Sequence, residues 1–131
     1  MRILVIDDEP LVADVIAEAL TLEGNDVVVA SSGKEGLRVI VQNPPDVIFL
    51  DIIMPGMDGI EVLRAIREWH LRLPVIILSG RVSESQLEEA RRLGVTEVIS
   101  KPVPLKNLAR ALRQLASRKH VYLTSEHGTV S

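Results

Sequence analysis

The protein has 131 residues, 47% of them hydrophobic and 25% charged, so the chain has enough apolar side chains for one folded core and too few for two. A net charge of -3 gives no general affinity for nucleic acid, and the absence of cysteine excludes disulfides, thiolate metal sites and a cysteine nucleophile. No apolar stretch approaches the length of about 20 residues that spans a membrane. We therefore expect a cytoplasmic domain that binds neither membranes nor nucleic acid directly.

The first predicted elements are a strand and an amphipathic helix. The run Ile3 to Ile6 is apolar and continuous, which favours a buried strand. After Pro10, apolar residues recur at helical spacing and predict a helix that ends near Gly24. The residues of this stripe are Leu11, Val12, Val15, Ile16, Ala19 and Leu20.

The middle of the chain repeats this alternation. Strands are predicted at Val27 to Val29 and Val47 to Leu50. Between these two strands, Ser32 and Glu35 form a capping-box pattern, which predicts that a helix starts there. Asp58 and Glu61 form the same pattern, so we assign Asp58 to helix capping and not to chemistry.

The last third contains two further strand and helix pairs. Val75 to Leu78 predicts a strand, and Val95 to Ile99 is a weaker one. The capping pattern of Ser83 and Gln86 and the stop signal of Gly94 bound the helix between them. The final helical stripe comprises Leu105, Leu108, Ala109, Leu112, Leu115 and Ala116.

Five alternations of strand and helix predict an α/β domain with one parallel sheet and helices on both faces. We place this domain at residues 1–118 and interpret 119–131 as a polar tail or the start of a linker. In open sheets of this class, ligands bind at the carboxyl ends of the strands.

Polar residues follow the predicted strands at that edge. Asp7 and Asp8 follow the first strand, Asp51 the third, Ser79 the fourth and Lys101 the fifth. Carboxylates brought together repel one another unless a cation neutralises them, and one lysine does not balance three. Oxygen ligands of this kind suit Mg²⁺, which is commonly held by carboxylates, water and phosphate oxygens. The edge therefore predicts a magnesium-dependent site for a phosphoryl group.

Each of these residues also has an ordinary structural interpretation. An acid before Pro10 is a common helix start, so Asp8 taken alone is more often a cap than a metal ligand. Ser79 and Lys101 taken singly are most often solvated loop residues. The functional interpretation depends on their joint placement.

The complete pattern resembles the receiver domain of two-component response regulators, of the chemotaxis-regulator type. The resemblance runs from Arg2 to about Arg118 and is carried by the acidic pair, the stretch DIIMPGMDG, the Ser-Gly pair and the Lys-Pro pair. It implies a flavodoxin-like sheet of strand order 2-1-3-4-5. It also implies a cis peptide bond before Pro102.

The resemblance further implies a role for each residue at the edge. Asp51 is the expected phosphoacceptor, with Ser79 and Lys101 binding the phosphoryl oxygens. Asp7, Asp8, Asp51 and the backbone carbonyl of Ile53 are the expected Mg²⁺ ligands. Such a domain promotes its own phosphorylation and dephosphorylation and is not a conventional enzyme.

The expected partner is a sensor histidine kinase or a phosphotransfer protein, with small phosphodonors as substitutes. The output partner and dimerisation on phosphorylation stay open. Val98 stands where the family usually carries an aromatic switch residue, and it supports an alternative function, a receiver-like interaction module that works without phosphate. A flavodoxin-like electron carrier is disfavoured, because the acids after the first strand would repel a flavin phosphate.

Overall fold

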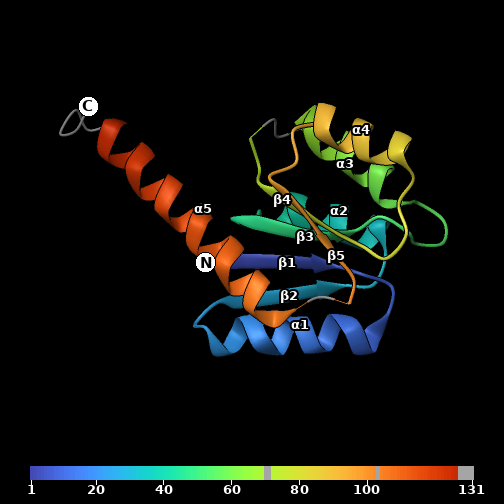
Figure 1. Ribbon diagram of the computed structural model, residues 1–131, viewed down its shortest axis with the longest axis horizontal. Coiled ribbons are helices and arrows are strands. Elements are labelled where there is room, and N and C mark those ends of the chain that lie inside the picture. Colours follow the sequence, from blue (N-terminus) through green and yellow to red (C-terminus); the bar gives the residue numbers. More distant parts are fainter. Residues whose placement is uncertain (70–71, 103, 127–131) are drawn as a thin grey trace.

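The computed structural model describes residues 1–69, 72–102 and 104–126, those from 116 onward for the backbone alone. Five strands alternate with five helices (Figure 1). Within the described residues, no helix combines the length and the apolar character needed to cross a membrane. In chain order the elements are β1 Arg2–Ile6, α1 Pro10–Leu22, β2 Asp26–Ala30, α2 Gly33–Gln42, β3 Val47–Asp51, α3 Gly59–Trp69, β4 Val75–Ser79, α4 Glu84–Arg92, β5 Glu97–Ser100 and α5 Leu105–Glu126.

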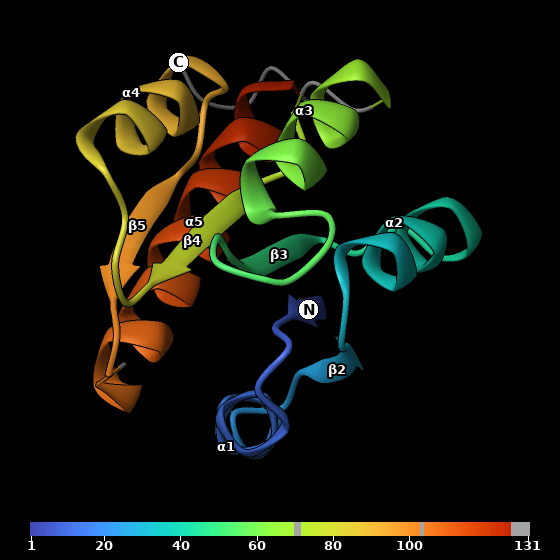
Figure 2. The same cartoon turned by 90° about the vertical axis from the view of Figure 1, so that its right-hand side faces the viewer.

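The strands form one parallel sheet in the order β2-β1-β3-β4-β5, which confirms the predicted fold. Helices cover both faces, with α1 and α5 on one side and α2, α3 and α4 on the other (Figure 2). Strands β3 and β4 are buried along their whole length. This burial explains why their sequences are continuously apolar instead of alternating.

The helix ends follow the predicted signals closely. The Ser83 and Gln86 pair forms the full capping box, whereas Ser32 caps α2 and the Glu35 carboxylate bonds to Ser31 instead. The predicted stop residues Gly24 and Gly94 have φ values of 92° and 74°. A left-handed backbone of this kind ends a helix at little cost only with glycine.

Two sequence predictions need correction. Strand β5 begins at Glu97 and not at Val95, because the Val95 amide still bonds to the Ala90 carbonyl at the end of α4. The apolar stripe of α1 is wider than its buried face, since Leu11 is 83% and Val15 is 53% exposed. The residues of α1 that pack into the core are Ala13, Ile16 and Leu20.

Helix α5 is longer than the predicted domain. It runs to Glu126 and so includes residues 119–126 of the predicted tail, and residues 127–131 lie outside the described part. In Figure 1 its last turns extend beyond the sheet. The division between domain and tail stays a prediction.

Candidate functional site

The candidate site lies at the carboxyl edge of the sheet. Asp7 directly follows β1, Asp51 ends β3, Ser79 ends β4 and Lys101 directly follows β5. These strands are successive neighbours in the sheet, and parallel strands end at the same edge. The topology therefore brings together side chains that are up to 94 residues apart in the chain.

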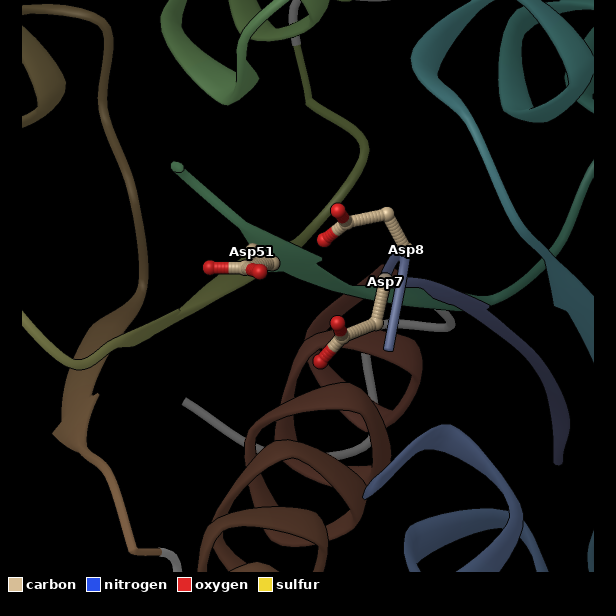
Figure 3. Close-up of side chains that lie close together, drawn as sticks. All are labelled: Asp7, Asp8 and Asp51. Carbon is tan, nitrogen blue, oxygen red and sulfur yellow. The ribbon is translucent and has the colours of Figure 1, made fainter. Parts of the chain in front are cut away.

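Three carboxylates gather at this edge. Asp7, Asp8 and Asp51 each have an oxygen within 4.8 Å of the other two, and their side chains lie close together at the ends of β1 and β3 (Figure 3). Asp7 and Asp51 are buried, whereas Asp8 is partly exposed. Hard oxygen donors at this spacing fit a divalent cation such as Mg²⁺, because it would neutralise charges that otherwise repel.

Lys101 provides the positive charge of the site. Its Nζ lies 2.9 Å from Asp7 Oδ2 and 3.2 Å from Asp51 Oδ2. Its backbone amide donates to the Ser79 carbonyl at 2.7 Å, and the peptide bond to Pro102 is cis, as the resemblance implied. Burial by itself would lower the pKa of Lys101, but the hydrogen bond to Asp7 and the charges of Asp51 and Asp7 raise it above its ordinary value. The ammonium therefore stays charged.

Asp51 has an unusual environment for a carboxylate. Burial raises its pKa from the ordinary 3.8 to about 6; the Lys101 charge opposes this change and the Asp7 charge adds to it. The Ile53 amide donates to Asp51 Oδ1 at 3.3 Å. Asp51 is thus mostly ionised at neutral pH, but its surroundings stabilise the ionised form only weakly. Such a carboxylate is suited to attack phosphorus.

The chain turns sharply after Asp51, and Gly59 makes this possible. A Cβ on Gly59 would lie 2.6 Å from the Ile52 Cα and would also clash with the Asp51 carbonyl, so a larger residue would displace the segment that carries Asp51. Asp58 accepts from the Glu61 amide at 3.0 Å, and Glu61 accepts from the Asp58 amide at 3.2 Å. The assignment of Asp58 to helix capping is confirmed.

The capping interpretation of Asp8 is wrong. The N-cap of α1 is Glu9, and its side chain makes no capping hydrogen bond. Pro10 occupies the first helical turn, so the helix begins one residue later than a cap at Asp8 would require. Asp8 is left free to point towards Asp51 (Figure 3).

Glu9 itself was missed as a site residue. Its Oε1 lies 3.2 Å from Lys101 Nζ, although its side chain is 59% exposed. The sequence offered one signal, namely the position of Glu9 directly after the acidic pair at the strand end. The same position before Pro10 also fits a helix start, so the signal does not by itself distinguish the two roles.

The remaining predicted residues are placed as follows. Ser79 is buried at the end of β4, where it pairs with Ser100 of β5. Ile53 follows Asp51 by two residues and is 52% exposed. Val98 is partly buried and packs against the core cluster that includes residues of α3 and α4. Its short side chain therefore faces the helix layer and not the site.

The family model and the solved structures that the chain matches point to the same family. Residues 3–113 match the family described as response regulator receiver domain. The chain is 36% identical to a receiver domain protein from Clostridium thermocellum, with a TM-score of 0.85, covering 92% of this chain and 98% of that one. It is 35% identical to the receiver domain of Francisella response regulator 1452, with a TM-score of 0.82 and coverage of 90% and 98%.

Curated relatives are longer. The chain is 39% identical to the transcriptional regulatory protein KdpE of Mycobacterium tuberculosis, over 88% of this chain and 51% of that protein. It is 36% identical to the transcriptional regulatory protein QseB of Escherichia coli O157:H7, over 99% of this chain and 60% of that protein. The chain thus spans little more than half the length of these relatives.

Proposed function

The chain belongs to the response regulator receiver domain family, and we propose that it accepts a phosphoryl group on Asp51 from a histidine kinase or a phosphotransfer protein. The observation that carries this proposal is the placement of Asp51, which is buried, lies beside two further carboxylates and is 3.2 Å from the Lys101 ammonium. This combination of an ionised nucleophile and a fixed cation suits phosphoryl transfer, which requires positioning and charge stabilisation more than covalent catalysis.

The transfer follows from the chemistry of the side chains. An oxygen of the Asp51 carboxylate attacks phosphorus while the P–N bond to the donor histidine breaks, and the imidazole leaves with the bond electrons and takes up a proton from water. Lys101 stabilises the charge on the phosphoryl oxygens, and the Ser79 hydroxyl binds one of them. Water later hydrolyses the acyl phosphate and regenerates Asp51.

A divalent cation belongs to the same proposal. Asp7, Asp8, Asp51 and the backbone carbonyl of Ile53 would hold Mg²⁺, which when bound neutralises charge on the carboxylates and the phosphoryl oxygens. The intact acid cluster and Lys101 favour this function over a phosphate-independent interaction module. Transcriptional regulation is named for whole relatives about twice as long, so for this chain we propose only the receiver chemistry and a cytoplasmic location.

Labelling by a small phosphodonor tests the proposal. With acetyl phosphate and Mg²⁺, the intact mass should increase by one phosphoryl group, and chelation of the metal should prevent this. Asp51→Asn should abolish the adduct. Asp58→Asn is a matched control in the same loop, because asparagine still caps α3, and it should be labelled like the parent. Equal labelling of Asp51→Asn would place the acceptor elsewhere.

A further inference from the structure

The Lys101 ammonium is fully engaged in the unphosphorylated protein. A lysine ammonium has three N–H donors, and three carboxylates lie within hydrogen-bond distance: Asp7 at 2.9 Å, Glu9 at 3.2 Å and Asp51 at 3.2 Å. A phosphoryl group on Asp51 adds further acceptor oxygens and negative charge. Since Asp51 itself becomes the acyl phosphate, its contact with Lys101 passes to phosphoryl oxygens, and the carboxylates of Asp7 and Glu9 compete with these oxygens for the other two donors.

Glu9 is the carboxylate that is most easily released. The side chains of Asp7 and Asp51 are 0% and 4% exposed, whereas that of Glu9 is 59% exposed. An exposed ion pair contributes little to stability, because water replaces the lost partner at little cost. The buried Asp7 has no such replacement.

Glu9 also differs from the other two acids in its role at the site. It lies outside the cluster formed by Asp7, Asp8 and Asp51, and its side chain does not cap α1. Neither the candidate metal site nor the helix start therefore requires its carboxylate. Within the part of the chain that the structure describes, the ion pair of its carboxylate is with Lys101, beside the position where the phosphoryl group would be attached.

We propose that Glu9 is a positioning residue that holds Lys101 in the unphosphorylated site and disfavours the phosphorylated form. This inference rests on the proposed function of Asp51. Glu9 acts in two ways, and both weaken the binding of a phosphoryl group. It occupies an N–H donor of Lys101, and its negative charge repels the incoming anion. Removal of the charge should therefore favour phosphoryl binding without weakening metal binding.

Beryllofluoride, which mimics a phosphoryl group on a carboxylate, tests the proposal at equilibrium. Its affinity is measured by calorimetry at saturating Mg²⁺ for the parent, Glu9→Gln and the control Glu18→Gln. Glu18 is exposed on α1, the helix that Glu9 precedes, and forms no ion pair within the described residues, so its variant has the same net charge as Glu9→Gln and leaves the contact with Lys101 intact. Glu9→Gln should bind about three- to tenfold more tightly, and Glu18→Gln like the parent.

Two further measurements distinguish a charge effect from a structural one. The gain should shrink when the ionic strength rises from about 0.05 M to about 0.5 M, because salt screens exposed charges. The Mg²⁺ affinity of Glu9→Gln without beryllofluoride should stay within about twofold of the parent value, since Glu9 is outside the acid cluster.

The inference would be overturned by unchanged or weaker beryllofluoride binding in Glu9→Gln, by an equal gain in Glu18→Gln, by a gain insensitive to salt, or by a large loss of Mg²⁺ affinity. Each of these outcomes leaves the proposed function intact, because the parent still binds the mimic. Failure of the parent to bind beryllofluoride would overturn the proposed function and this inference together.

Discussion

The Lys101 ammonium lies 2.9 Å from the fully buried carboxylate of Asp7, across 94 residues of sequence. The contact joins the end of β1 to the end of β5, although β3 and β4 lie between these strands in the sheet. It is possible because a lysine side chain is long enough to reach along the carboxyl edge. One cation thus serves the acids of two different strands.

Replacement of this cation should destabilise the metal-free protein. In Lys101→Met the buried Asp7 carboxylate would keep the hydrogen bond from the Glu9 amide but lose its cation, and loss of one partner of a buried ion pair typically costs about 3–5 kcal/mol before protonation of the acid relieves part of it. Chemical denaturation with a chelator present measures the loss. Lys106→Met, an exposed substitution on α5, is the control and should change the free energy of unfolding by less than about 0.5 kcal/mol. Equal stabilities of the two variants would show that Asp7 is adequately solvated.

Asp51 should make stability depend on pH. Its pKa is raised to about 6 in the folded protein, so the folded state binds a proton more readily than the unfolded state between about pH 4 and pH 6. The contribution of Asp51 is therefore most favourable at low pH and is lost as pH rises through 6. In chelator, Asp51→Asn should be more stable than the parent by about 1–3 kcal/mol at pH 8, and this difference should disappear near pH 4. A difference that is constant with pH would contradict the assignment.

Asp8 should bind metal without supporting the fold. Asp8→Asn should weaken Mg²⁺ binding at least about tenfold, because it removes a charged oxygen ligand, and it should leave the thermal stability of the metal-free protein unchanged or higher, because it relieves repulsion. Calorimetric Mg²⁺ titration and thermal unfolding measure the two effects. Asp14→Asn, an exposed change on α1, is the control for net charge. Parent-like Mg²⁺ affinity in Asp8→Asn would remove Asp8 from the metal site.

Val98 should limit the structural response to phosphorylation. A valine has one side-chain torsion and little surface to expose, so a shift of Ser79 should change the surface of α4, β5 and α5 less than a rotating aromatic ring would. Hydrogen exchange with and without beryllofluoride should show changes concentrated from Ser79 to Glu88. In Val98→Tyr the changes should spread to β5 and α5. Changes of equal size across Val98 and 105–112 in the parent would show that coupling needs no aromatic residue.

The sequence by itself determined the class of fold and the edge of the sheet where the site lies. Continuous apolar runs separated by helical stripes permit few arrangements other than a parallel sheet between helices, because neither face of such a strand tolerates water. Once the strands are parallel, the residues that follow them must meet at one edge. For this reason Asp7, Asp51, Ser79 and Lys101 were placed correctly from the sequence.

Only the tertiary structure decided which contacts form at that edge. The pairing of Glu9 with Lys101 depends on the direction in which the chain leaves β1 and enters α1. The helical periodicity of the sequence does not predict that direction. The buried face of α1 likewise depends on how the helix is turned on the sheet, so Ala13 is buried and Leu11 is exposed. The pKa of Asp51 depends on desolvation by neighbours that are distant in sequence, and burial of that kind exists only once the chain is folded.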